Sequence, residues 1–173
     1  MIHVLYLISI SELPQKNLLK TFDCGIEELN IYLSRYAEKN DKLEIGKTFI
    51  ALTQTKKIAG YFTIATAQVK FEDLPETTKQ HLPKYPIPAL RVARLAVNKS
   101  FQKKGIGKYL LTQAFIKTVH VADITGLYFI IVDAKESSAS FYEQFGFQSF
   151  TDKALTYFLP VETIRKAMRL RQN

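Results

Sequence analysis

Hydrophobic positions along the chain alternate between the spacings of strands and of helices. The apolar run at 3–10 is too short to cross a bilayer and predicts a buried strand. Apolar residues recur at helical spacing over 26–39 and again over 105–121, which predicts two helices. The continuous apolar run at 127–132 is typical of a central strand covered on both faces. The pattern also predicts strands at 47–54, 58–71, 90–97, 147–150 and 155–159, and helices at 72–80, 137–145 and 161–170.

Turn signals join these elements into an α/β chain. Residues 55–57 separate two strand patterns so closely that an antiparallel hairpin is predicted. Three prolines at 81–88 predict an irregular segment there. The order β-α-β-α over 90–146 is the strongest unit, and the chain of 173 residues shows no repeat or long linker. We therefore expect a single domain over 1–173.

Composition adds a basic charge and little else. The net charge of +8 favours anionic partners such as phosphates or nucleic acid. The lone Cys24 permits no internal disulfide, and we interpret it as a buried apolar residue rather than a nucleophile. Three histidines and one cysteine show no metal-ligand spacing, so no metal is expected. The apolar start lacks a basic region and a cleavage site, which favours a cytoplasmic protein.

The segment between the strand at 90–97 and the helix at 105–121 carries the most specific chemistry. Lys103, Lys104 and Lys108 surround Gly105 and Gly107 at the helix start. Backbone N–H groups at a helix start lack partners, and the helix dipole is positive there. Because glycine lets a ligand approach the backbone, this loop predicts a pyrophosphate site. The alternative is a glycine turn with solvated lysines, and neither the P-loop nor the Rossmann spacing is present.

Several motifs in order resemble known acetyltransferases. Gln102-x-x-Gly105-x-Gly107 resembles the (Q/R)-x-x-G-x-(G/A) motif of the GNAT superfamily. Over about residues 22–164, the chain also resembles the GNAT toxins of bacterial type II toxin–antitoxin systems. Asn98 departs from that pattern, because such toxins often carry an acid there. The motifs of this second resemblance are Phe22-Asp23-Cys24-Gly25 with Leu29-Asn30 and Leu33, Tyr85–Pro88, Arg94–Val97, Val132–Lys135 and Phe141–Phe147.

The resemblance implies a single GNAT acyltransferase domain of mixed α/β (α+β) class, with a central mixed β-sheet and helices on both faces. It implies acetyl-CoA as co-substrate, with the pyrophosphate in the glycine loop and the pantetheine arm on a bulged strand at 95–97. It further implies an aminoacyl-tRNA acceptor, a ribbon-helix-helix antitoxin and a homodimer. The residues implied to bind acetyl-CoA are Leu95, Ala96, Val97, Gln102, Lys103, Lys104, Gly105, Ile106, Gly107, Lys108 and Ser137.

Tyr142 is the candidate general acid. Amine acetylation needs a neutral amine and a proton for the departing thiolate. The sequence shows no His–Asp or Cys–His pairing, which favours direct transfer in a ternary complex over a covalent acetyl-enzyme. Tyr142 lies within the helix predicted after the central strand, and the resemblance implies that it protonates the CoA sulfur. The alternative is a core tyrosine whose hydroxyl reaches solvent; Phe141, Phe145 and Phe147 are interpreted as core.

No acidic residue occurs between Glu76 and Asp123, whereas this span holds nine lysines and arginines. Lys79, Lys84, Arg91 and Arg94 remain after the phosphates of CoA are matched, and they predict contacts to tRNA. The alternative is a solvated basic face. Residues three apart on a regular strand face opposite sides, so Arg91 and Arg94 share a face only if the strand is bulged. If only one faces the acceptor, Arg91 is the candidate.

Two other functions stay open at this stage. The first is a GNAT enzyme that acetylates a small amine or a protein amino group. A small cationic amine would need an acidic pocket, and the sequence has few acids near the predicted site. The second is a regulatory module that binds CoA without turnover, against which Tyr142 argues.

Overall fold

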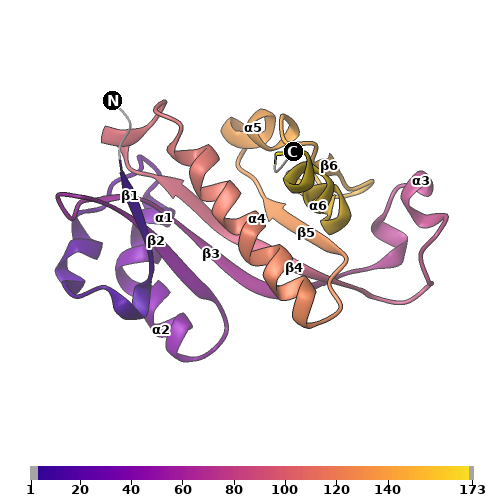
Figure 1. Ribbon diagram of the computed structural model, residues 1–173, viewed down its shortest axis with the longest axis horizontal. Coiled ribbons are helices and arrows are strands. Elements are labelled where there is room, and N and C mark those ends of the chain that lie inside the picture. The colour runs from indigo at the N-terminus through magenta and orange to yellow at the C-terminus, as the bar shows by residue number, and fades with distance from the viewer. Residues whose placement is uncertain (1–3, 172–173) are drawn as a thin grey trace. The chain divides into compact units, whose positions relative to one another are not determined.

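The computed structural model describes residues 4–171, and its strands form one mixed sheet in the order β1-β2-β3-β4-β5-β7-β6 (Figure 1). The β4–β5 pair is parallel, and the β1–β2, β2–β3, β5–β7 and β6–β7 pairs are antiparallel. The strands are β1 (Leu5–Ser9), β2 (Lys47–Thr53), β3 (Ile58–Val69), β4 (Ile87–Val97), β5 (Phe129–Asp133), β6 (Gln148–Ser149) and β7 (Thr156–Pro160). The α-helices are α1 (Glu27–Ile31), α2 (Ala37–Lys42), α3 (Glu76–Lys79), α4 (Ile106–Ile124), α5 (Ala139–Glu143) and α6 (Val161–Leu170).

The chain divides into two compact units. Residues up to Ala65 with 93–114 form the first, and 66–92 with the residues from Phe115 onward form the second. The strands β3 and β4 and the helix α4 each contribute residues to both units. The mixed sheet with its helices confirms the predicted fold class, and the single domain over 1–173 stays a prediction.

The first unit covers both faces of its strands with helices. Tyr61 of β3 packs with Leu33 and Ile50 in a buried cluster, and its hydroxyl donates to the Leu29 carbonyl of α1 at 2.8 Å. Successive strand residues point to opposite faces. The neighbouring Gly60 therefore points away from α1, and the side chain of Leu110 from α4 lies there.

Gly60 permits the close approach of β3, β4 and α4. A Cβ atom at this position would lie 2.7 Å from the Ala96 carbonyl oxygen and 2.7 Å from Cδ1 of Leu110. Carbon atoms do not approach this closely without displacement, and one of the two neighbours is backbone. Only glycine therefore fits between β4 and α4, the two elements that flank the predicted phosphate loop.

The second unit is built around β5. The β4–β5 pairing runs from Ala89↔Phe129 to Val92↔Val132, and β7 pairs with β5 on the other side. The first four residues of β5 are buried, which confirms the predicted central strand. Phe129 and Phe158 meet edge to face at 5.2 Å between ring centroids and anchor the core of this unit.

The structure corrects several predicted element bounds. Ile87 and Pro88 begin β4, although 81–88 was predicted to be irregular. The predicted helix at 26–39 is interrupted by a π-helical turn over Tyr32–Tyr36 between α1 and α2. Short 3-10 turns at Ile10–Glu12, Lys16–Thr21 and Lys99–Phe101 carry no periodic signal and were not predicted. The hairpin of β2 and β3 is confirmed. Among the described residues, no helix is long and apolar enough to cross a membrane.

Substituting Gly60→Ala is expected to lower the free energy of unfolding by about 1–3 kcal/mol, the usual cost of overpacking. Urea denaturation of the purified variant measures this loss. Gly126→Ala is the matched control, because a Cβ there would meet nothing within 4 Å. Equal stabilities of the two variants would contradict the packing constraint.

Candidate functional site

The loop between β4 and α4 has the backbone shape of an anion site. Lys103 has a φ of 59° and Gly105 a φ of 80°, with a residue of negative φ between them. Such alternation turns successive N–H groups toward one concave side, which attracts anions. A lysine in the left-handed region costs about 1–2 kcal/mol, and strain of this kind concentrates at functional sites.

Free N–H groups at the start of α4 extend this concave surface. The first helical hydrogen bond runs from the Tyr109 amide to the Gly105 carbonyl at 3.0 Å. The amides of Ile106, Gly107 and Lys108 therefore precede any carbonyl partner within the helix. A Cβ at Gly105 would have nothing within 4 Å, so the space beside the loop is open. Backbone donors, helix dipole and open space together suit a diphosphate.

The lysines of the loop differ in their availability. Lys103 and Lys108 are exposed, and within residues 4–171 neither forms an ion pair. Lys104 instead folds back, with its Nζ 2.8 Å from the Ser100 carbonyl oxygen and 5.8 Å above the Phe101 ring centroid. Two of the three lysines are thus free to neutralise a phosphate.

Gln102 holds the loop through internal hydrogen bonds. Its Nε2 donates to the Cys24 carbonyl oxygen at 2.9 Å and to the Val97 carbonyl oxygen at 3.0 Å. The side chain therefore joins the end of β4 to the segment before α1. Sequence reasoning grouped Gln102 with the ligand contacts and missed this structural role, because Cys24 is distant in the chain.

The predicted pantetheine strand runs directly into this loop. Ala96 is buried, whereas Leu95 and Val97 are partly exposed. Ile106 is buried at the start of α4 and fixes the inner side of the loop. The contacts of these residues with acetyl-CoA, and those of the exposed Ser137 before α5, stay predictions, as does the bulge in β4.

Tyr142 in the second unit has a buried ring. Tyr142 is 5% exposed, and its ring packs edge to face against the rings of Phe141 and Phe147, with 5.1 and 5.7 Å between the ring centroids. Burial, and then the charge of Asp133, raise the pKa of Tyr142 to about 12. The hydroxyl is therefore protonated at neutral pH, so that it can donate a proton but cannot act as a base.

The Tyr142 hydroxyl is nevertheless accessible. No side-chain oxygen in the described residues is both buried and without a hydrogen-bond partner. The Tyr142 hydroxyl has no such partner, so its oxygen must reach solvent although its ring does not. A buried ring with an accessible hydroxyl fits both a proton donor and the alternative of an amphipathic core tyrosine.

The two arginines predicted to bind the acceptor are engaged differently. Arg91 pairs through Nη1 with Asp133, which follows the last buried residue of β5. Arg94, in the first unit, lies 4.6 Å above the Tyr32 ring centroid, and its Nη1 donates to the Ala93 carbonyl at 2.9 Å. Arg91 thus has a neutralising partner, whereas most of the five N–H donors of Arg94 are not used in hydrogen bonds among the described residues.

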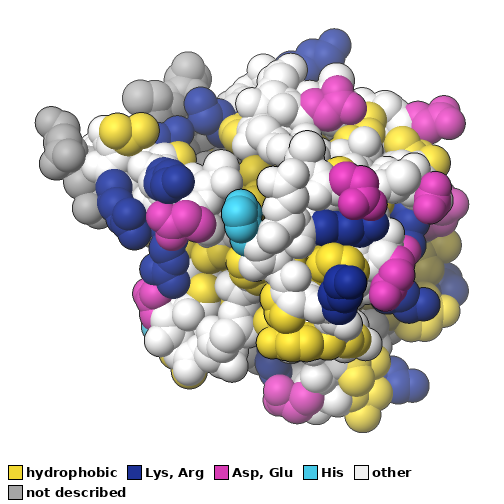
Figure 2. All heavy atoms as spheres, turned by 90° about the vertical axis from the view of Figure 1, so that its right-hand side faces the viewer, with side chains coloured by type: hydrophobic (Ala, Val, Ile, Leu, Met, Phe, Trp, Pro, Cys, Tyr) yellow, Lys and Arg dark blue, Asp and Glu magenta, His cyan; other side chains and the backbone are white. Residues whose placement is uncertain are grey.

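The two predicted lysines also differ. Lys79 forms an ion pair with Glu76 at 2.8 Å and lies 5.7 Å above the Phe71 ring centroid. Lys84 is exposed and, in the described part of the chain, unpaired. Figure 2 likewise shows Lys and Arg side chains interspersed with Asp and Glu side chains on the face that it draws. The acid-free span in sequence is not an acid-free surface.

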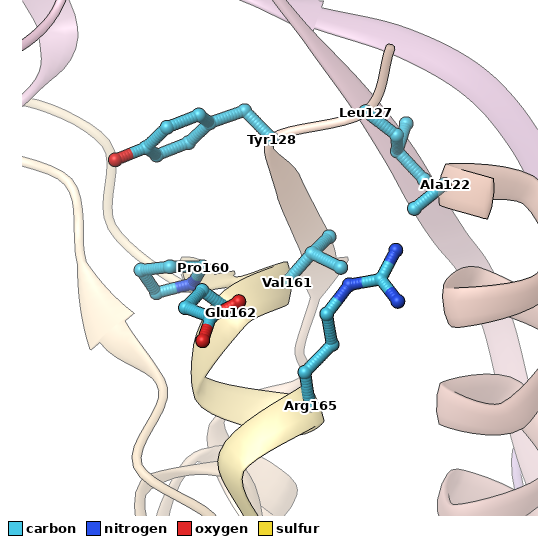
Figure 3. A pocket seen from close by; sticks show the side chains of 7 residues that line it. All are labelled: Ala122, Leu127, Tyr128, Pro160, Val161, Glu162 and Arg165. Carbon is cyan, nitrogen blue, oxygen red and sulfur yellow. The ribbon is translucent and has the colours of Figure 1, made fainter. Parts of the chain in front are cut away.

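A separate pocket lies in the second unit. It has a volume of about 180 Å³, and the Arg165 side chain extends from α6 toward Ala122, another of its lining residues (Figure 3). The Arg165 guanidinium pairs with Asp123 at 2.6 Å. None of the predicted site residues lines this pocket, and it is not the candidate site. Among residues 4–171, no group of three or more His, Cys, Asp or Glu side chains could hold a metal ion.

Comparison with known proteins identifies the family of the chain. Residues 44–149 match the model of the acetyltransferase (GNAT) domain. A tRNA-acetylating toxin of Mycobacterium tuberculosis is 30% identical over 129 residues, which are 74% of this chain and 76% of that protein. AtaTR bound with AcCoA superposes with a TM-score of 0.81 at 25% identity, covering 95% of this chain and 98% of that one. AtaT complexed with acetyl-methionyl-tRNAfMet superposes with a TM-score of 0.84 at 23% identity, covering 95% and 99%.

The fold and the family match define the class of acetyltransferases. The chain belongs to the GNAT acetyltransferase family. This finding confirms the resemblance read from Gln102-x-x-Gly105-x-Gly107 and the prediction of an N-acetyltransferase.

The environment of Tyr142 predicts a particular titration. The phenol pKa rises from 10.0 to about 12 on folding, so its contribution to stability is complete below pH 10 and is lost as the pH rises toward 12. Relative to Tyr142→Phe, the wild type is expected to lose up to about 3 kcal/mol of unfolding free energy across this interval. Urea titrations at several alkaline pH values measure it. Parallel pH profiles of the two proteins would contradict a buried phenol.

Proposed function

We propose that this protein transfers the acetyl group of acetyl-CoA to the amino group of an aminoacyl-tRNA, as the toxin of a type II toxin–antitoxin pair. The observation that carries this proposal is the backbone conformation of the loop before α4, with Lys103 and Gly105 in the left-handed region, which suits an anion. The relative named as a tRNA-acetylating toxin supports the acceptor. Blocked amino groups on charged tRNA would stop translation.

Acetyl-CoA fits the loop by charge and by space. The amides of Ile106, Gly107 and Lys108 would donate to the pyrophosphate, and Lys103 and Lys108 would neutralise it. The strand residues Leu95, Ala96 and Val97 would hold the pantetheine arm, with Gln102, Lys104 and Ser137 completing the set. When bound, acetyl-CoA supplies a thioester carbonyl that is activated toward amines.

Tyr142 is proposed as the general acid of direct transfer. The raised pKa keeps the phenol protonated at neutral pH, and edge-to-face contacts with Phe141 and Phe147 hold its ring. Protonating the sulfur makes the thiolate a better leaving group as the amine nitrogen attacks the carbonyl. No covalent acetyl-enzyme is required.

The acceptor is proposed to be held by Lys79, Lys84, Arg91 and Arg94. We expect Lys84 and Arg94 to contribute most to acceptor binding. Lys84 is unpaired in the described chain, and Arg94 has free N–H donors. We further propose that the protein forms a homodimer, that a ribbon-helix-helix antitoxin neutralises it, and that it acts in the cytoplasm, where charged tRNA is present. Residues 1–173 are proposed to form one domain.

Replacing Tyr142 by Phe is expected to lower kcat by on the order of 10²–10⁴, the usual contribution of a general acid, without weakening acetyl-CoA binding. Stopped assays with charged tRNA measure kcat, and calorimetry measures the binding. Tyr128→Phe, which changes a 43% exposed tyrosine of the same unit, is the control and should keep its turnover. Undiminished kcat in Tyr142→Phe would leave Tyr142 as a packing residue.

When the protein is incubated with labelled acetyl-CoA and a pool of charged tRNA, we expect it to transfer the label only to charged tRNA. Transfer should fall as salt rises, because phosphate contacts release counterions. Deacylated tRNA, free amino acids and polyamines are the parallel acceptors. Label on polyamines or free amino acids, and none on charged tRNA, would favour a small-amine acetyltransferase. Acetyl-CoA binding without transfer to any acceptor would favour a regulatory module.

A further inference from the structure

The Phe22-Asp23-Cys24-Gly25 motif has no role in the proposed chemistry, yet it forms a dense hydrogen-bond network in the first unit. Oδ1 of Asp23 accepts from the Gly25 amide at 2.8 Å and from Nδ2 of Asn30 at 3.0 Å. Its Oδ2 accepts from Nζ of Lys99 at 2.8 Å. Oδ1 of Asn30 in turn accepts from the Cys24 amide at 2.9 Å. The turn over 23–25 is thus fixed at both ends.

The same turn contacts the segment that precedes the phosphate loop at two points. The Lys99 amide donates to the Asp23 carbonyl oxygen at 2.8 Å. The Cys24 carbonyl oxygen accepts from Nε2 of Gln102, which also binds the Val97 carbonyl oxygen. The segment from Val97 to Gln102 is therefore tied to the turn twice, directly before the strained Lys103.

Gly25 shows how closely the two segments fit. Its φ of 89° is unfavourable for any residue with a side chain, and a Cβ there would lie 3.1 Å from Cε of Lys99. The aliphatic part of Lys99 therefore lies across the turn while its ammonium group reaches Asp23. Backbone shape and charge select the same arrangement of Lys99.

Hydrogen bonds keep Asp23 ionised at neutral pH. The hydrogen bond from Lys99, and then those from the Gly25 amide and Asn30, lower the pKa of Asp23 to about 2. The carboxylate therefore stabilises the fold above pH 4, and this contribution is lost as the pH falls toward 2. At neutral pH the network is permanently charged.

We propose that Asp23 is a positioning residue for acetyl-CoA binding, which holds the phosphate loop in its binding shape through Lys99 and Gln102. This inference rests on the proposed function of the loop. The loop keeps Lys103 in a costly conformation and its amides without partners, so it needs external support before the ligand arrives. A loop that is already ordered loses less entropy when it binds its ligand.

The sign of the effect separates positioning from simple electrostatics. Asp23 is an anion near a site for anions, so removing its charge should strengthen acetyl-CoA binding if only the field matters. If Asp23 acts by positioning, removal weakens binding. Asp23→Asn tests this selectively: the amide oxygen can still accept from Gly25 and Asn30, whereas the amide NH₂ cannot accept from Lys99.

Isothermal titration of purified wild type and Asp23→Asn with acetyl-CoA is the experiment. The Kd of the variant is expected to rise about three- to tenfold, as for the loss of a networked charged hydrogen bond at an exposed site. The KM for acetyl-CoA should rise in parallel, while kcat at saturation stays within about twofold. Lys99→Met should weaken acetyl-CoA binding by a similar factor. The Kd of the double variant should not exceed the larger of the two Kd values of the single variants.

Two controls frame the result. In the second unit, Asp73 forms a similar ion pair with Nζ of Lys153 at 2.6 Å, and these two residues are also distant in the chain. Asp73→Asn breaks this pair and should leave the Kd for acetyl-CoA unchanged. Gly107→Glu places an anion in the diphosphate site and sets the baseline without binding. If the wild type itself does not bind acetyl-CoA, the proposed function fails. If the wild type binds and Asp23→Asn binds equally or more tightly, or Asp73→Asn weakens binding as much, the positioning role of Asp23 is overturned.

Discussion

The structure of the candidate site depends on backbone N–H groups that the protein leaves without partners. The amides at the start of α4 cannot bond within the helix, and the loop before them adds two left-handed residues, Lys103 and Gly105. Such an arrangement is costly by itself and becomes favourable when an anion accepts these donors. The close packing and the hydrogen bonds around the loop stabilise this conformation.

Close packing provides the first part of that support. Gly60 lets β3 lie directly against the Ala96 carbonyl and against Leu110 of α4, so that the strand before the loop and the helix after it share one packing contact. The Asn98 amide also donates to the Ala59 carbonyl at 2.9 Å, next to the same glycine. Hydrogen bonds from Gln102 and Lys99 provide the second part of the support. Shape and polar contacts thus restrain the loop from different sides.

The sequence predicted what depends on local patterns and missed what depends on distant partners. The central strand and the β2–β3 hairpin follow from spacing within a few residues, and both were predicted correctly. The ion pair of Arg91 with Asp133 joins residues that are 42 positions apart, so no local pattern could show it. The π-helical turn at Tyr32–Tyr36 gave no signal, because its apolar positions also satisfy an ordinary helix.

The distribution of charge shows why this distinction matters for function. A span without acids suggested a continuous basic surface, but folding brings acids back to it. Asp133 neutralises Arg91, and Glu76, at the edge of the span, neutralises Lys79. The cations left for polyanions are therefore fewer than the sequence count, and they include Lys84, Lys103 and Lys108. Since phosphate affinity depends on cations that are free to replace counterions, these unpaired residues would contribute more to the binding of an anionic partner than the paired Arg91 and Lys79.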